Sequence, residues 1–503
     1  MSTNVSKSLL EKINERTIHY FEEISKIPRA SGKEQAAADY LVDFANKHGF
    51  SHRRTTDIIN EKQTCSVIIY KPATTGYQDI EAFVLQAHID MVCQKEPDSN
   101  HNFDTDPIEL IIKGNIMTAN KTTLGADNGV GVAIMLAILE SNEIDHPPIE
   151  ALFTSDEEDG MSGVKAITKD MLTGKRLINI DSEQEGVFTY GCAGGKMVDI
   201  CIPITYEPVP EGYTLLQVDI LGLVGGHSGV EIHEGRANSQ LLLARTLRAI
   251  QLETSLRIAS IVGGDRRNVI PRTASATICV PKDMTGTVKE IAHKMQDIFA
   301  REYLGVESGI SIVLYPYNEN NDDGKALDKC LNEESTSKVI SSILIIPNDV
   351  LAMHSQVEGL VGTSCNLGLT ILGEKTFSLM SHIRSFTSTK KDFAADQFRM
   401  VANILGAEYI GGAEYPNWEP NVDSPLLKQF KDVYESTFSD KSPRFKSIHA
   451  GLECGFISQI FPDMDMISCG PNIGGAHSPD EWVDLDSNKR IVELILNVLA
   501  KKE

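Results

Sequence analysis

Three apolar runs, each typical of a buried strand, are followed directly by histidine or carboxylate side chains. Open parallel sheets bind ligands at the carboxyl ends of their strands, so side chains after three such runs are expected to converge. His, Asp and Glu bind zinc and similar cations, and the same residue types transfer protons. The runs are 83–87, followed by His88 and Asp90; 151–153, followed by Asp156, Glu157, Glu158 and Asp159; and 177–180, followed by Asp181.

Each of these residues also has a simpler structural interpretation. His88 alone could be a hydrogen-bonded core histidine, Asp181 could cap a strand end, and Glu157 with Glu158 could form a solvated acidic turn. The His-x-Asp spacing favours a metal role for His88, because metal-bound histidines commonly donate their other ring N–H to a carboxylate such as Asp90. Adjacent carboxylates cannot both be buried and ionised without a cation, which favours a metal on one and a proton carried by the other.

Two glycine-rich segments carry further candidates. The segment 125–131 (GADNGVG) does not have the G-x-G-x-x-G spacing, and Asp127 would place negative charge where a phosphate should lie. We therefore exclude nucleotide binding there and read a turn followed by a helix over 129–142. His477 follows the run 464–468 through a second Gly-rich loop, and taken alone its role stays ambiguous.

Up to about residue 195, the elements that must position these residues alternate between apolar strand-like runs and helical patterns, as in α/β proteins. The apolar runs predict a mostly parallel sheet with helices on both faces. From about 196 the pattern changes to alternating strands and helices, including strands near 216–220 and 274–280 and a helix near 237–250. A similar order recurs over 358–405, which predicts an α+β insertion built from two β-α-β-β-α-β-like halves. We infer one domain formed by residues 1–195 and 416–503, with residues 196–415 inserted into it.

Composition excludes several classes of partner. The formal net charge of -23 argues against nucleic acid and anionic membranes, because both select for clustered Lys and Arg. The first 29 residues predict an amphipathic surface helix and not a signal peptide, and no later run is long enough to span a bilayer. Nine cysteines without a C-x-x-C pair fit reduced thiols better than a disulfide framework. We expect a cytoplasmic protein.

Six motifs in order along nearly the whole chain resemble the co-catalytic zinc exopeptidases, the family that includes aminoacylases and carboxypeptidases. Within that family they are most similar to the aminoacyl-histidine dipeptidase branch, also known as peptidase D or cytosol non-specific dipeptidase. No metal or catalytic position departs from the family pattern. The motifs are 88–92 (HIDMV), 123–129 (TLGADNG), 154–158 (TSDEE), 179–183 (NIDSE), 226–229 (GHSG) and 475–478 (GAHS).

The resemblance implies a zinc exopeptidase-like fold and two zinc ions per chain, for which Mn or Co could substitute. Asp127 would bridge the ions, followed by a cis peptide bond to Asn128, and Asp90 would orient His88. Glu157, not itself a ligand, would be the base that activates water and later protonates the leaving amine. The implied ligand sets are His88, Asp127 and Asp181 for the first ion, and Asp127, Glu158 and His477 for the second.

The resemblance also assigns residues of the insertion, which it identifies as a lid domain. His227 would stabilise the oxyanion, while Asn268 and Arg384, together with Gly451 of the catalytic domain, would bind the substrate and its terminal carboxylate. The implied reaction is hydrolysis of unblocked dipeptides of broad specificity, including Xaa-His. The alternatives are an N-acyl amino acid amidohydrolase on the same scaffold and a non-catalytic metal-binding interaction protein. The sequence leaves open whether the chain forms a homodimer.

Overall fold

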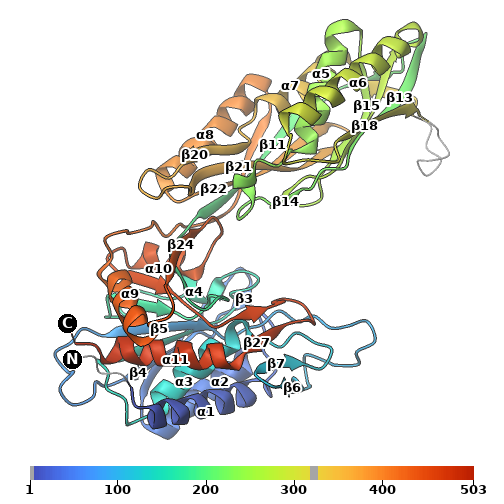
Figure 1. Cartoon of the computed structure of the whole chain (residues 1–503). Coiled ribbons are helices and arrows are strands. Elements are labelled where there is room, and N and C mark those ends of the chain that lie inside the picture. Colours follow the sequence, from blue (N-terminus) through green and yellow to red (C-terminus); the bar gives the residue numbers. More distant parts are fainter. Residues whose placement is uncertain (1–4, 318–326, 503) are drawn as a thin grey trace. The chain divides into compact units, whose positions relative to one another are not determined.

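A computed structural model describes residues 5–317 and 327–502 of the chain (Figure 1). The chain divides into two compact units. Unit 1 comprises Met1–Cys192, Pro420–Ser447 and Leu452–Glu503, and unit 2 comprises Ala193–Glu419 and Ile448–Gly451. Gly451 therefore groups with the inserted segment in unit 2. The sequence had placed it in the catalytic domain. No helix in the described ranges has both the length and the apolar character needed to cross a membrane.

The central sheet of unit 1 has eight strands, and its middle is parallel. Strand β5 pairs in parallel with β8 on one side and β9 on the other, and β9 pairs in parallel with β25. This confirms the predicted parallel strands, whose residues are buried on both faces of the sheet. In sheet order the strands are β1 (Ser51–Arg54), β4 (Val67–Lys71), β8 (Ile149–Thr154), β5 (Phe83–His88), β9 (Arg176–Asn179), β25 (Asp465–Ser468), β10 (Val187–Cys192) and β24 (Arg444–Ile448).

Five helices of unit 1 share one hydrophobic core with the sheet. They are α1 (Lys7–Ile24), α2 (Gln35–His48), α3 (Ala126–Glu140), α9 (Pro425–Thr437) and α11 (Leu485–Ala500). Helix α3 is apolar around its whole circumference, as expected of a helix buried between sheet and other helices. The short helices α4 (Ser162–Lys165) and α10 (Glu453–Ile460) lie on the opposite face of the sheet, so helices cover both faces as predicted (Figure 1).

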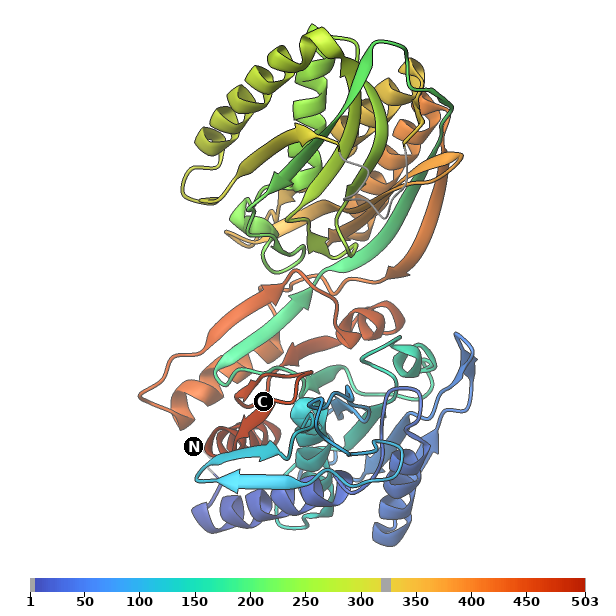
Figure 2. The same cartoon turned by 90° about the vertical axis from the view of Figure 1, so that its right-hand side faces the viewer.

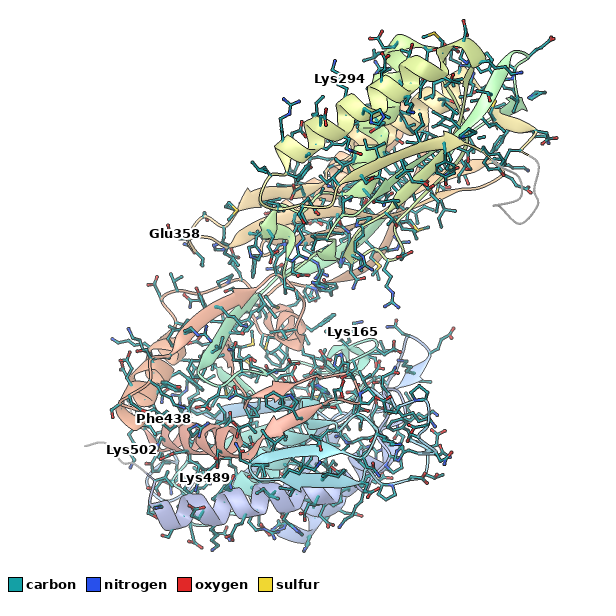
Figure 3. All side chains as sticks on the ribbon, turned by 45° about the vertical axis from the view of Figure 1, so that its right-hand side comes forward. Lys165, Lys294, Glu358, Phe438, Lys489 and Lys502 are labelled. Atoms are coloured by element: carbon teal, nitrogen blue, oxygen red, sulfur yellow. The ribbon has the colours of Figure 1, made fainter. Side chains whose placement is uncertain are left out.

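Side-chain caps and ion pairs fix the ends of these helices. The Ser6 hydroxyl accepts a hydrogen bond from the backbone N–H of Leu9 at the start of α1, and the Asp484 carboxylate caps α11. Lys489 of α11, labelled in Figure 3, pairs with Glu11 of α1. The regular part of α3 starts only after Asn128, because Asp127 and Asn128 have non-helical backbone angles.

Two small sheets complete unit 1. One has the order β26 (Ile473–Gly474), β27 (Trp482–Asp484), β7 (Ile116–Ala119) and β6 (Leu110–Lys113), and the other pairs β2 (Ile58–Ile59) with β3 (Lys62–Gln63). Strands β26 and β27 form a hairpin in which Ile473 lies opposite Val483. This hairpin presents the loop that contains His477.

Unit 2 is built on one nine-stranded sheet with its helices on one face (Figures 1 and 2). Its helices are α5 (Ser239–Glu253), α6 (Thr285–Glu302), α7 (Glu333–Ile345) and α8 (Ser388–Leu405), with short 3-10 turns at Ile232–Glu234 and Lys282–Met284. The main strands are β11 (Gly194–Pro203), β13 (Tyr213–Leu221), β15 (Arg257–Gly263), β17 (Ala274–Pro281), β18 (Ser311–Pro316), β20 (Asp349–Met353), β21 (Val361–Leu372), β22 (Thr376–Ser385) and β23 (Glu408–Tyr415). Two further pairs are β12 (Tyr206–Pro208) with β19 (Lys329–Leu331) and β14 (Gly226–His227) with β16 (Val269–Ile270).

The strand order of unit 2 reveals the two halves predicted from the sequence. The first half runs β13-α5-β15-β17-α6-β18 and has the sheet order β18-β13-β17-β15. The second half runs β11-α7-β21-β22-α8-β23 and has the reversed order β21-β22-β11-β23, so that β15 and β21 join the halves. Because β11 precedes the whole first half in the chain, the second half is not a contiguous repeat, which explains why its periodicity is weak in the sequence.

Candidate active site

The three predicted strand ends meet in unit 1. His88 is the last residue of β5, Glu157 and Glu158 follow β8, and Asp181 follows β9. Strand β5 is central, with β8 and β9 on either side, so the chain order reverses there. Ligand sites of open α/β sheets lie at such reversal points, outside the carboxyl ends of the strands.

The first group of potential metal ligands consists of His88, Asp127 and Asp181, whose ligand atoms all lie within 4.8 Å of one another. His88 Nε2 is 3.0 Å from Asp127 Oδ1 and 3.3 Å from Asp181 Oδ1. The side-chain amide of Asn128 donates a hydrogen bond of 2.6 Å to Asp181 Oδ1, which orients that carboxylate. The peptide bond between Asp127 and Asn128 is cis, as the resemblance implied.

The second group consists of Asp127, Glu158 and His477. His477 Nε2 is 3.2 Å from Asp127 Oδ2 and 2.8 Å from Glu158 Oε1. Asp127 thus directs one carboxylate oxygen at each group, which is the arrangement a bridging ligand requires. The ligand atoms of His88, Glu157 and Glu158 form a third group and also lie within 4.8 Å of one another, so Glu157 lies next to both predicted ligands.

Asp90 connects these potential ligands to the base candidate. Its carboxylate is fully buried, and Oδ1 lies 3.3 Å from His88 Nδ1, in position to orient the imidazole. The same carboxylate accepts the backbone N–H groups of Glu157 and Glu158, at 3.0 and 3.1 Å, and the hydroxyl of Ser31 at 2.8 Å. Asp90 therefore fixes the acidic pair as well as the histidine, a second role that the sequence did not reveal.

The electrostatics of the cluster favour a bound cation. Burial raises the pKa of Asp181 to about 6 against the opposing effect of His88, and nearby Asp127 and Glu158 raise it further. Burial together with Asp181, Glu453 and Glu158 raises the pKa of Glu157 well above its usual range. Contacts with Asp127 and Glu158 raise the pKa of His477 to about 10. Crowded carboxylates of this kind attract positive charge, and a set of imidazoles and carboxylates suits zinc, manganese or cobalt.

A buried polar network beneath the three strand ends was missed from the sequence. Glu453 Oε2 accepts hydrogen bonds from the Gln86 side-chain amide at 2.7 Å and from the Thr154 hydroxyl at 2.6 Å. Gln86 in turn accepts a hydrogen bond from the Asn179 side-chain amide. Burial raises the pKa of Glu453 to about 8. Gln86 and Asn179 are polar residues inside otherwise apolar strands, and this pattern could have indicated the network from the sequence. Nothing near Glu453 in the sequence indicates that Glu453 belongs to it.

Unit 2 brings His227 and Asn268 together through the pairing of β14 with β16. His227 lies opposite Val269, and the backbone N–H of Ser228 bonds to the carbonyl of Asn268 at 2.9 Å. His227 Nδ1 accepts the backbone N–H groups of Gly229 and Val230, each at 3.2 Å. Burial and the charge of Arg384 lower the pKa of His227. The neutral imidazole therefore carries its proton on Nε2 and can donate it in a hydrogen bond.

Arg384 and Gly451 also lie near each other in unit 2. Arg384 is 4% exposed, its Nη1 donates to the Tyr415 hydroxyl at 2.8 Å, and its Nε has no hydrogen-bond partner among the described residues. A Cβ on Gly451 would lie 2.8 Å from the Tyr415 ring, so only glycine fits there. Burial and Arg384 lower the pKa of His382 and of His449 to about 3. The cluster therefore places one fixed cation, the Arg384 guanidinium, among neutral imidazoles. Three of its members, Tyr415, His382 and His449, were not singled out from the sequence.

Comparisons with known proteins agree with this architecture. The model of the peptidase family M20/M25/M40 matches residues 84–501. The cytosol non-specific dipeptidase of Escherichia coli (strain K12) is 37% identical over 482 residues, which cover 96% of each chain. The crystal structure of aminoacylhistidine dipeptidase from Vibrio alginolyticus superimposes with a TM-score of 0.89 at 37% identity and 96% coverage of each chain.

A more distant solved structure shares the fold alone. Aminopeptidase PepT from Bacillus cereus has a TM-score of 0.58 at 14% identity, covering 97% of this chain and 98% of its own. The predicted α/β exopeptidase fold and the family resemblance are both confirmed by these matches. With a family model that spans most of its length and a full-length relative at 37% identity, this chain belongs to the peptidase family M20/M25/M40.

Proposed function

We propose that the chain hydrolyses unblocked dipeptides of broad specificity, including Xaa-His, and that it requires two metal ions. The observation that carries the proposal is the position of Asp127, whose two carboxylate oxygens each face a separate group of potential ligands. The dipeptidase names of two relatives, each 37% identical over 96% of this chain, support the substrate class.

His88, Asp127 and Asp181 would hold one ion, and Asp127, Glu158 and His477 the other. We propose zinc for both sites, with manganese or cobalt as substitutes that the same donors accept. When bound, the metal pair would lower the pKa of the attacking water and polarise the peptide carbonyl. Asp90 would keep His88 oriented through its contact with Nδ1.

Glu157 is proposed as the general base and acid. Two neighbouring observations support this role, namely its backbone anchored on Asp90 and its side chain close to both His88 and Glu158. Its raised pKa suits a group that accepts a proton from water and returns it to the leaving amine. Glu158 Oε1 already contacts His477 Nε2 at 2.8 Å. Glu157 is therefore the carboxylate of the pair that is available for proton transfer.

Residues of unit 2 are proposed to bind the substrate. Arg384, with Gly451 beside it, would bind the terminal carboxylate. Its Nε, which has no hydrogen-bond partner within 5–317 and 327–502, supports this because a buried guanidinium needs acceptors. Asn268 would contribute a side-chain hydrogen bond. His227 would donate its Nε2–H to the oxyanion that forms at the attacked carbonyl, since its Nδ1 is committed to backbone donors.

Replacing His227 with alanine is expected to lower kcat by about 100- to 1,000-fold, the usual effect of removing one oxyanion donor. KM should change little, because the oxyanion exists only in the transition state. Steady-state kinetics on a free dipeptide measure both quantities. His233, an exposed histidine in the following turn, provides the control, and His233→Ala should retain wild-type kinetics. An unchanged kcat in His227→Ala would remove His227 from the proposal.

Changing Arg384 to lysine is expected to raise KM for free dipeptides by about 10- to 100-fold, because lysine keeps the charge but loses the planar set of donors. The comparison substrate is the same dipeptide with a C-terminal amide, which lacks the carboxylate. The penalty should disappear with the amide. Arg399→Lys, at an exposed arginine of α8, is the matched control. An equal penalty on both substrates would show that Arg384 acts by some other route.

The alternative on this scaffold is hydrolysis of N-acyl amino acids. Unblocked dipeptides and their N-acetylated forms differ only at the amino group, so their relative kcat/KM values separate the two functions. We expect cleavage of the free dipeptides alone. Preference for the acetylated forms would establish the amidohydrolase, and cleavage of neither form by protein with full metal occupancy would favour a non-catalytic metal-binding protein.

The proposal also covers location and partners. We propose that the protein acts in the cytoplasm on small peptides, in line with the name of its Escherichia coli relative. The net charge of -23 supports the exclusion of nucleic acid and membrane surfaces as partners. Sedimentation of the purified chain would establish whether it forms a homodimer.

A further inference from the structure

Glu481 is a buried carboxylate on the loop that contains His477. It is 2% exposed and precedes β27 directly. Its hydrogen-bond donors are the backbone N–H groups of four consecutive residues of the Asp127 turn. Oε2 accepts from Leu124 at 2.7 Å and Gly125 at 2.9 Å, and Oε1 accepts from Ala126 at 2.8 Å and Asp127 at 3.2 Å.

Four successive N–H groups at the start of a helix form a cradle for an anion. The glycine-rich segment excluded above as a nucleotide site therefore does bind an anion, but that anion is a side chain of the same protein. Hydrogen bonds to a charged acceptor are about twice as strong as those between neutral groups. Glu481 thus holds the backbone of Asp127 from a loop that lies some 350 residues away in the sequence.

Arg29 holds the same turn from the other side. It is 2% exposed, and its guanidinium donates to the carbonyl oxygens of Gly125 at 2.7 Å, Ile89 at 3.1 Å and Asp90 at 2.9 Å. A Cβ on Gly125 would lie 2.4 Å from Arg29 Nη2, and its φ of +70° also favours glycine. The peptide groups of Gly125 are therefore fixed by opposite buried charges, and Arg29 ties them to the end of β5.

We infer that Glu481 is a positioning residue that couples the loop of His477 to the turn of Asp127 and so sets the geometry of the second metal site. The inference rests on the proposed function, because it assumes that Asp127 and His477 share an ion. Both ligands stand on irregular backbone, and Glu481, four residues beyond His477, hydrogen-bonds its own loop to the backbone of the Asp127 turn. Outer partners of this kind typically account for a 10- to 100-fold difference in metal affinity, about the effect expected here.

The test compares Glu481→Gln with Asp480→Asn. Asp480 is the exposed neighbour on the same loop, so its variant loses the same charge without touching the backbone donors. Metal-free protein is titrated with zinc in a calorimeter. Asp480→Asn should bind two ions with the same affinities as the wild type. Glu481→Gln should bind one of its two ions about 10- to 100-fold more weakly than the wild type does. Its activity should be low at limiting zinc and recover as zinc is added.

Thermal melts of the metal-free proteins separate positioning from simple stabilisation. Wild-type zinc affinities in a folded Glu481→Gln variant would overturn the inference, even if its melting temperature fell. If Glu481→Gln does not fold, Glu481→Asp is tested in its place, because aspartate keeps the charge and moves the carboxylate. Weaker binding of one ion by Glu481→Asp would support the inference, and wild-type affinity for both ions would overturn it. Failure of the wild-type chain to bind two ions would instead contradict the proposed function.

Discussion

Replacing Asp127 with alanine is expected to abolish dipeptide hydrolysis and to weaken the binding of both metal ions at once. The reason is geometric, because Asp127 is shared by the two ligand groups and directs a different oxygen at each. Affinity for both ions should fall by more than the 10- to 100-fold typical of losing an outer partner. Zinc titration of metal-free protein measures this directly.

Asp486 provides a matched control for this change. It is an exposed acid in the first turn of α11, as Asp127 is an acid in the first turn of α3. Asp486→Ala should retain two ions and full activity. If Asp127→Ala lost only one ion, Asp127 would be a terminal ligand of that ion and its bridging role would be wrong.

Replacing Glu157 with glutamine is expected to lower kcat by about 100- to 10,000-fold while leaving two bound ions in place. Glutamine preserves the size of the side chain but cannot accept a proton from water. Its backbone N–H would still bond to Asp90, so the ligands should keep their positions. Metal analysis and single-turnover kinetics on the same preparation measure both parts of the expectation.

Asp159→Asn is the control for Glu157→Gln, because Asp159 belongs to the same acidic run and is largely exposed. It should keep wild-type turnover. Near-normal kcat for Glu157→Gln would exclude Glu157 as the base, and loss of an ion would show that Glu157 serves as a ligand, in line with the third grouping of His88, Glu157 and Glu158.

The strand-end residues were predictable because local sequence carries the relevant physics. A buried parallel strand is a continuous apolar run, and polar residues directly after it must lie at the carboxyl edge of the sheet. The positions of His88, Glu157 and Asp181 at that edge were predicted in this way. Asp127 was not, because its turn looks like any helix start, and the role proposed for it came only from the family resemblance.

Residues whose partners are backbone groups or distant segments left no local signal. Glu481 and Arg29 satisfy their buried charges with N–H and C=O groups, so neither shows a complementary charge nearby in the sequence. Glu453 meets Gln86 across 367 residues. Similarly, β11 belongs to the second half of the unit 2 sheet but precedes the whole first half in the chain. A search for a contiguous repeat in the sequence therefore does not reveal this half. These features depend on the completed fold.

Stepwise metal reconstitution tests the dinuclear dipeptidase most directly. Protein freed of metal with a chelator is titrated with zinc while hydrolysis of a free dipeptide and of its N-acetylated form is followed. The proposal predicts two ions bound per chain, no hydrolysis before metal is added, and cleavage of the free dipeptide alone as the second ion binds. Full hydrolysis by the metal-free chain, or binding of a single ion at full activity, would contradict it.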